Sequence, residues 1–194
     1  MSADLNPSSQ EFFEEMYRCS ADPWNFAGDA YERSRYDALL TALTGRHYGR
    51  AFEPGCSIGV LTEGLAPLCD EVLAIDLSAT AISQARERCL AFPNVRFAVA
   101  SICDVDPGPL DLLVLSEIGY YFAVADLRAW ADRLLMSLLP GGAVLACHWL
   151  GSSPDHQLTG DEVHAILQEL AEARAYKLSL SQRTENYQLA CWTH

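Results

Sequence analysis

The segment from Arg50 to Val60 constrains the fold of this chain more than any other part of the sequence. It runs Arg-Ala-Phe-Glu-Pro-Gly-Cys-Ser-Ile-Gly-Val, which is typical of a short strand, a glycine turn and a helix start. Gly55 removes the Cβ where backbone N–H groups must approach a ligand, and Gly59 lets the helix pack closely against its strand. Asp76 follows 21 residues after Gly55, near the roughly 20-residue interval at which a βαβ unit returns a carboxylate to a ribose. The pattern predicts a site for an adenosine-bearing ligand. The alternative is that the glycine loop has only a structural role.

Strand and helix patterns alternate regularly from residue 49 onward. Apolar runs at 50–53, 71–75, 95–99, 110–116 and 143–149 predict strands, and helical patterns lie between most of them. Ser78 is a suitable N-cap for a helix over 79–90, and a second apolar stripe extends from Leu127 to Leu138. Strands that are joined by crossover helices pair in parallel with right-handed connections. The sequence therefore predicts an α/β, Rossmann-like, doubly wound sheet.

The C-terminal part of the chain predicts a helix followed by a β-hairpin. Thr159 is a suitable N-cap for a helix over 161–173, whose apolar residues fall on one side. Two strand-like runs, 176–181 and 187–193, are joined by so short a link that antiparallel pairing is favoured. The expected core is thus a mostly parallel seven-stranded sheet whose last strand runs antiparallel.

Residues 1–48 precede this sheet and predict two helices. Ser8 and Glu11 form the pattern of a capping box for the first helix, the Asp22-Pro23-Trp24 segment turns the chain, and Tyr31 begins the apolar face of the second. Ligands of open α/β sheets bind outside the carboxyl ends of the strands, where a cover is useful. We therefore expect residues 1–48 to act as a lid on the core of residues 49–194, within one domain overall. The alternative is a pair of helices that only pack on the sheet.

Composition excludes several classes of function. The chain has 194 residues, half of them apolar, and its formal net charge of −13 would repel a phosphate backbone, so nucleic acid is not an expected partner. Seven cysteines without a Cys-x-x-Cys pair favour free thiols in a reducing compartment, and residues 1–10 lack the features of a signal peptide. The apolar stretch 134–150 is too short to span a bilayer. We expect a cytoplasmic protein, monomer or homodimer, with no membrane partner and no metal site.

The glycine turn itself resembles a known motif. A dinucleotide fingerprint that begins at Gly55 needs glycines at positions 57 and 60, where this chain has Ser57 and Val60. The order acid-x-Gly-x-x-x-Gly instead resembles motif I of class I S-adenosylmethionine (SAM) methyltransferases, in which Ser57 replaces the middle glycine. The resemblance implies that SAM is the cofactor and S-adenosylhomocysteine (SAH) the product.

Further segments resemble a narrower group, the nodulation protein S (NodS)-like methyltransferases. They are the turn at 22–24, Tyr-Glu-Arg-Ser-Arg-Tyr at 31–36, the glycine turn at 53–59, and Ser-Glu-Ile-Gly-Tyr-Tyr at 116–121. Members of this group N-methylate the amino sugar of a chitooligosaccharide. The resemblance implies the reaction more strongly than the acceptor, because NodS-like enzymes with other acceptors also exist.

The resemblance assigns cofactor contacts residue by residue. They are Glu53, Gly55, Cys56 and Gly59 for the methionine part of SAM, Asp76 and Leu77 for the ribose, Ser101 and Ile102 for the adenine, and Ser116 beside them. A carboxylate suits a ribose because it accepts two hydrogen bonds at once. Ser101 stands where the family often has an acid, a second departure after Ser57. Arg35 would reach the SAM carboxylate, although an exposed helix arginine is the favoured alternative.

Candidate catalytic groups lie where the fourth and fifth strands end. Glu117 and His148 are the candidate general bases, and Tyr120 is a helper. The alternative for His148 is a structural role. The expected walls of the acceptor pocket are aromatic and suit a sugar ring or an ammonium; they are Trp24, Tyr31, Tyr121 and Trp149, with His156, Asp161 and His164 as a possible extension.

These observations favour a SAM-dependent methyltransferase that acts on a nitrogen or oxygen atom of a small molecule, such as an amino sugar or a chitooligosaccharide-like amine. Two alternatives stay open. The first is a non-catalytic protein that binds SAM or SAH, because fold alone does not establish activity. The second is a nucleotide-dependent oxidoreductase, which the missing glycines disfavour.

Overall fold

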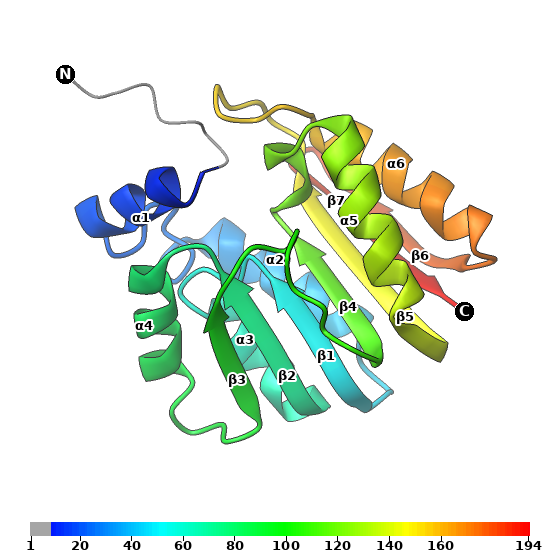
Figure 1. The fold of residues 1–194 in the computed structure, drawn as a ribbon, viewed down its shortest axis with the longest axis horizontal. Coiled ribbons are helices and arrows are strands. Elements are labelled where there is room, and N and C mark those ends of the chain that lie inside the picture. The colour runs from blue at the N-terminus through cyan, green and yellow to red at the C-terminus, as the bar shows by residue number, and fades with distance from the viewer. Residues whose placement is uncertain (1–8) are drawn as a thin grey trace.

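Seven strands form one central sheet, and helices cover both of its faces (Figure 1). The structure is a computed structural model that describes residues 9–194. The strands are β1 (Tyr48–Pro54), β2 (Cys69–Asp76), β3 (Val95–Val99), β4 (Leu110–Ser116), β5 (Leu138–Trp149), β6 (Lys177–Arg183) and β7 (Tyr187–Thr193). The helices are α1 (Gln10–Cys19), α2 (Ala30–Ala42), α3 (Val60–Leu65), η1 (Ala66–Leu68), α4 (Ala79–Arg88), η2 (Gly119–Tyr121), α5 (Val124–Met136) and α6 (Gly160–Ala173).

The strand order is β3-β2-β1-β4-β5-β7-β6. The strands from β3 to β5 pair in parallel, whereas β7 runs antiparallel to both β5 and β6. The direction of winding reverses between β1 and β4, and ligands of open α/β sheets bind at such a switch point. The expected doubly wound, mostly parallel sheet with an antiparallel last strand is confirmed.

Alternating side chains divide the core into two layers. On β4, Leu112 and Val114 belong to the layer under α2, α3 and α4, while Leu113 and Leu115 belong to the layer under α5 and α6. Successive residues of a strand point to opposite faces, so a central strand covered on both sides is apolar throughout. Neither core layer covers the carboxyl ends of the parallel strands, where polar side chains lie.

The fifth strand differs from its sequence prediction. Leu138 was expected on the apolar stripe of a helix, but α5 ends at Met136 and Leu138 opens β5, where it pairs with Leu110. The ladder shifts register before it resumes at Ala143. The glycines at 141 and 142 allow this irregular start, which periodicity alone does not reveal.

Helix caps were predicted well, with one exception. Ser78 caps α4, and Thr159 forms a complete capping box with Glu162 at the start of α6. Ser8, the expected cap of the first helix, lies outside the described residues. The side chain that caps α1 is that of Ser9, which accepts a hydrogen bond from the Phe12 N–H.

Two further features bear on the expectations from composition. No helix among residues 9–194 combines the length and apolar character needed to cross a bilayer. All seven cysteines are free; Cys19 and Cys103 are exposed and the other five are buried.

Gly59 connects the glycine turn to helix packing. It is the N-cap of α3 and has a φ of 79°, which disfavours any other residue. A Cβ at this position would lie 3.0 Å from the Cα and Cβ of Ala85 on α4. Gly59 therefore allows α4 to approach the turn closely.

We predict that Gly59→Ala destabilises the protein more than Gly141→Ala does. Gly141 has almost the same φ, 80°, but a Cβ there meets nothing within 4 Å, so this variant carries the backbone strain alone, about 1–2 kcal/mol. Gly59→Ala adds overpacking against α4, which typically costs about 1–3 kcal/mol more. Urea unfolding of both variants measures the difference. If both variants lost the same free energy of unfolding, the contact with Ala85 would not limit the size of the residue at position 59.

Candidate active site

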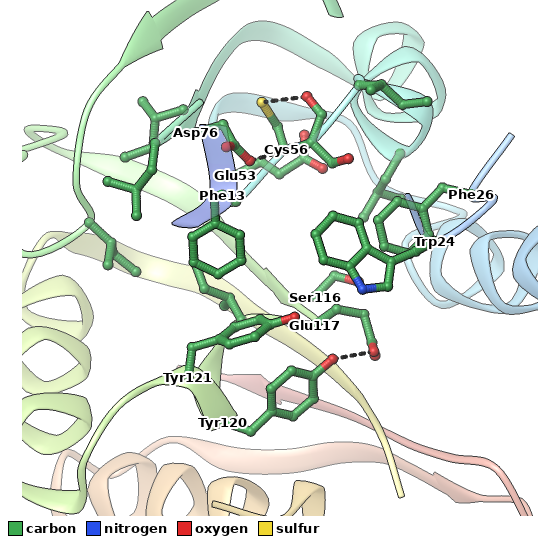
Figure 2. Close-up of a pocket in the computed structure, with 18 of the residues that line it drawn as sticks. Phe13, Trp24, Phe26, Glu53, Cys56, Asp76, Ser116, Glu117, Tyr120 and Tyr121 are labelled. Atoms are coloured by element: carbon green, nitrogen blue, oxygen red, sulfur yellow. Dashed lines mark hydrogen bonds between the residues drawn. The ribbon is translucent and has the colours of Figure 1, made fainter. Parts of the chain in front are cut away.

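A cavity of about 670 Å³ opens at the carboxyl ends of β1, β2 and β4, beside α1 and α2 (Figure 2). This volume is in the usual range for small-molecule sites. Most residues singled out from the sequence line it: Glu53, Gly55, Cys56, Asp76, Leu77, Ser101, Ile102, Ser116, Glu117, Tyr120, Trp24, Tyr31, Tyr121 and Trp149. His156 also lines it, whereas five of the residues singled out do not, namely Gly59, Arg35, His148, Asp161 and His164.

The glycine turn brings β1 against the end of β2. The N–H groups of Gly55 and Cys56 both donate to the carbonyl oxygen of Ile75, at 2.7 and 2.9 Å. Gly55 has a φ of 74°, and a Cβ there would lie 2.9 Å from Cδ1 of Ile118. The turn thus needs glycine both for its backbone conformation and for the space beside the loop after β4.

Glu53 carries a buried carboxyl group at one end of the cavity. Its side chain is almost fully buried, and the Thr62 hydroxyl donates to Oε2 at 2.6 Å. Burial raises the pKa of Glu53 to about 8, although the hydrogen bond from Thr62 acts in the opposite direction. A cationic ligand group beside Glu53 would favour its ionised form.

Asp76 is fixed at the end of β2 by two backbone donors. The Ser57 N–H binds Oδ2 and the Ser78 N–H binds Oδ1, both at 2.9 Å. Burial raises the pKa of Asp76, and these hydrogen bonds oppose the rise. A carboxylate has about four acceptor positions, so both oxygens keep room for a ligand diol.

The loop after β3 forms another wall of the cavity. The Ser101 hydroxyl oxygen accepts a hydrogen bond from the Cys103 N–H at 3.1 Å, which leaves its O–H and one lone pair for another partner. Arg133 of α5 binds the carbonyl oxygens of Ile102, at 2.6 Å, and of Val105. This loop is therefore held to α5 by a side chain about 30 residues away in the sequence.

Helix α1 covers the glycine turn. The Tyr17 hydroxyl donates to Oγ of Ser57 at 2.5 Å, and Ser57 itself has a φ of 51°. Glu14, one turn earlier, accepts hydrogen bonds from the Ser78 hydroxyl and the Thr80 hydroxyl, both at 2.7 Å. These contacts, chiefly that with Thr80, lower the pKa of Glu14 to about 2. Its acceptor contacts are therefore complete above pH 4.5 and are lost only as the pH falls toward 2.

Glu117 lies at the end of β4 and opposite Glu53 in the cavity (Figure 2). Its Oε1 accepts a hydrogen bond from the Trp149 N–H at 2.8 Å, and its Oε2 accepts one from the Tyr120 hydroxyl at 2.5 Å. Burial raises the pKa of Glu117, while Arg35 and the Tyr120 hydroxyl lower it. A carboxylate whose pKa is raised by burial is a better proton acceptor than an exposed one.

Arg35 is buried, with 1% exposure, so its favoured description as an exposed helix arginine was wrong. Its guanidinium binds Glu32 through Nε and Nη2, at 3.1 and 2.5 Å, and donates to the Ser116 hydroxyl at 2.9 Å. It also lies 3.5 Å from Oε1 of Glu117. Arg35 therefore contacts the groups that line the cavity from behind and is not itself a lining residue.

His148 is fully buried on β5 and outside the cavity. Its Nε2 lies 3.1 Å from the Gly119 N–H, and its Nδ1 lies 3.3 Å from Nε2 of His164. Both ring nitrogens thus have protein partners, and the ring is not among the groups that line the cavity. His148 does not have the geometry of the expected general base.

Aromatic rings form the remaining walls. Trp24 stacks on Phe26 with centroids 5.5 Å apart, and Tyr120 stacks on His156 at 3.8 Å. The His156 ring lines the cavity as expected, whereas Asp161 binds Arg183 at the surface and His164 is buried behind β5. The Tyr31 hydroxyl is buried and has no hydrogen-bond partner among residues 9–194.

Sequence analysis missed several lining residues. They are chiefly Phe13 and Tyr17 of α1, Phe26 in the turn, and Glu32 and Tyr36 of α2. Phe13 and Tyr17 are one helical turn apart, and the Phe13 ring packs edge-on against Tyr121 at 5.0 Å. Aromatic side chains at this spacing indicate an apolar helix face but not what the face contacts.

Comparison with known proteins decides the family. Residues 10–156, about three quarters of the chain, match the family model described as Nodulation protein S (NodS). The chain belongs to the nodulation protein S family. The NodS-like resemblance of the glycine turn and the aromatic segments is therefore confirmed.

Relatives in this family differ from the chain in extent. The nodulation protein S of Rhizobium tropici is 33% identical over 159 residues, which cover 77% of this chain and 65% of that protein. The chain thus spans just under two thirds of the length of this relative. A nodulation protein S from Sinorhizobium fredii is 33% identical over 124 residues, 62% of this chain and 57% of that protein.

Solved structures confirm the methyltransferase-type fold. The N-methyltransferase NodS from Bradyrhizobium japonicum WM9, in complex with SAH, superposes with a TM-score of 0.82 over 95% of this chain and 98% of that chain, at 24% identity. A protein from Pseudomonas syringae, provisionally described as a methyltransferase, has a TM-score of 0.73 and 35% identity, and covers 86% of this chain and 100% of its own.

We predict that Glu14→Ala loosens α1 from the glycine turn. The change removes the acceptor for the Ser78 and Thr80 hydroxyls, so α1 should unfold locally more often. Trypsin should then cleave after Arg18 several times faster. Glu11→Ala, in the exposed first turn of the same helix, is the control and should leave cleavage unchanged. If both variants are cleaved like the wild type, Glu14 does not hold α1 in place.

Proposed function

We propose that this protein transfers a methyl group from SAM to a nitrogen or oxygen atom of a small-molecule acceptor, with SAH as the product. One observation carries the proposal: the acid-glycine turn, Asp76, Glu117 and Tyr120 all open into a single cavity at the switch point of the sheet. Membership of the nodulation protein S family supports it. The fold shared with an N-methyltransferase that was solved with SAH supports it as well.

The residues present suit SAM at the end of the cavity that Glu53 and Asp76 share. We propose that Glu53 and the turn at Gly55 and Cys56 bind the methionine part, with Glu53 beside the ammonium group. Asp76 would bind the ribose hydroxyls through the acceptor positions that Ser57 and Ser78 leave free. Leu77, Ser101 and Ile102 would hold the adenine, and residues 1–48 would act as the lid.

The acceptor would lie between this end and Glu117. When bound, SAM supplies a methyl group on a sulfonium, which is a good leaving group, so holding the acceptor in line provides much of the catalysis. An amine that arrives protonated must lose a proton before it attacks. The Tyr120 oxygen keeps lone pairs while its hydrogen bonds Glu117, so Tyr120 can accept the acceptor proton and pass its own to Glu117.

The charges around the acceptor position favour an amine. Glu32, Arg35 and Glu117 form a partly buried cluster that carries one net negative charge when both carboxylates are ionised. Such a cluster attracts a cation and repels phosphates and carboxylates. The aromatic walls and the unpartnered Tyr31 hydroxyl suit a ring with polar groups, so an amino sugar or a chitooligosaccharide-like amine is the acceptor class that we propose.

We predict that Asp76→Ala weakens SAH binding about ten- to a hundredfold, because it removes charged hydrogen bonds to the ribose. Asp70→Ala, at the other end of β2, is the control; Asp70 is exposed and contacts only His47 among the residues described. Titration calorimetry with SAH measures both variants. An unchanged dissociation constant for Asp76→Ala would remove this carboxylate from the site.

We predict that SAH binding weakens as the pH falls from 8 to 6. The pKa of Glu53 is about 8, so this carboxyl is mostly protonated below that pH and must lose its proton to pair with the ligand ammonium. The dissociation constant should then rise by up to about tenfold for each pH unit. In Glu53→Gln the dependence should flatten. A wild-type constant that does not change with pH would contradict the pairing.

We predict that Glu117→Gln lowers turnover of an amine acceptor by roughly a hundredfold or more, the usual contribution of a general base, and changes SAH affinity little. Tyr120→Phe removes the relay hydroxyl and should act in the same direction. Mass spectrometry of SAH formation against a panel of amines, amino sugars and phosphorylated acceptors measures both. SAH binding without turnover of any acceptor would favour a non-catalytic binding protein, and a preference for phosphorylated acceptors would contradict the charge argument.

A further inference from the structure

Three consecutive residues of β5 hold the loop that follows β4. The Cys147 carbonyl oxygen accepts a hydrogen bond from the Glu117 N–H at 3.0 Å. The Gly119 N–H donates to His148 at 3.1 Å, and the Trp149 N–H donates to the Glu117 carboxylate at 2.8 Å. Strand β5 thereby holds both the backbone of this loop and the side chain of Glu117.

The loop needs such restraint because its backbone is strained. Glu117 has a φ of 55°, a left-handed conformation that is strained for a residue with a Cβ. Conformations of this kind persist only where the surroundings impose them, and they concentrate at functional sites. On its other side the loop is fixed by the N–H groups of Gln157 and Leu158, which both bind the Tyr120 carbonyl oxygen, at 2.8 and 3.2 Å.

His148 provides the one side-chain acceptor for this loop backbone among the described residues of β5. Its bond with Gly119 requires Nε2 to be unprotonated, since the Gly119 N–H is the donor. Nδ1 then carries the hydrogen and donates to Nε2 of His164 on α6. Burial lowers the pKa of both histidines, that of His164 to about 4, which agrees with two neutral rings. A Cβ at Gly119 would lie 3.1 Å from Nε2 of His148, so the contact is close.

We propose that His148 is a positioning residue: through the Gly119 N–H it sets the loop that presents Glu117 and Tyr120 to the acceptor. It touches neither SAM nor the acceptor. The inference rests on the proposed function, because Glu117 and Tyr120 have to act there. In a purely structural role, His148 would only pack between β5 and α6. In the proposed role, it positions the loop that carries Glu117 and Tyr120.

Two substitutions separate the two roles. His148→Phe keeps a ring of similar size and removes the acceptor, whereas His148→Gln offers an amide oxygen near the position of Nε2. In His148→Phe we expect exchange of the Gly119 amide hydrogen to accelerate about ten- to a hundredfold and kcat to fall by a similar factor, since a buried donor is left unpaired. The SAH dissociation constant and the acceptor KM should change about threefold or less, and His148→Gln should recover most of kcat.

A measurement on the wild type tests the proposal even if the variants do not fold. Long-range proton–nitrogen NMR correlations report which ring nitrogen carries the hydrogen, and His148 should be protonated at Nδ1 only. A hydrogen on Nε2 would overturn the proposal, as would wild-type kcat in His148→Phe or equal kcat losses in both variants. The His148 tautomer and the Gly119 exchange rate can be measured whether or not the proposed function is correct. If both are as expected but the wild type neither binds SAH nor methylates any acceptor, the proposed function fails.

Discussion

Burial of carboxylates at one edge of the sheet is the constraint on which the rest of this structure depends. Glu53, Asp76 and Glu117 end three parallel strands, and a buried carboxylate is costly unless donors surround it. Each is therefore bound: Glu53 by a hydroxyl, Asp76 by two backbone N–H groups, and Glu117 by a backbone N–H and a phenol. The loops adopt the conformations that supply these donors, including positive φ angles at Ser57 and Glu117.

The same constraint explains how the helices before the sheet contribute. α1 brings Glu14 to the N-terminus of α4 and Tyr17 to Ser57, so it closes on the side where Asp76 lies. α2 brings Arg35, the buried cation that partly compensates the charge of Glu117. One helix thus completes the part of the cavity proposed for SAM and the other the part proposed for the acceptor. The two parts meet in one cavity, as direct methyl transfer requires.

Much of this could be predicted from the sequence because it depends on local pattern. Strand alternation, helix caps and the spacing from Gly55 to Asp76 are set within short stretches of chain, and they gave the sheet and one end of the cavity. Tyr17 and Arg35 could not be placed in this way, since their partners lie 40 and 81 residues away and no local pattern encodes such a contact. The role of His148 was left open between a general base and a structural side chain for a related reason. Side chains alternate along β5, and its ring faces α6 and not the cavity.

The central claim is that one cavity holds SAM at the Glu53–Asp76 end and an acceptor beside Glu117 and Tyr120. A crystal structure of the protein with SAH tests it most directly. The account predicts the ribose on Asp76, the amino-acid end beside Glu53, and the sulfur facing open space that Tyr120 and Trp149 border. SAH in the reverse orientation, with its adenine against Tyr120, or SAH bound outside this cavity, would contradict it.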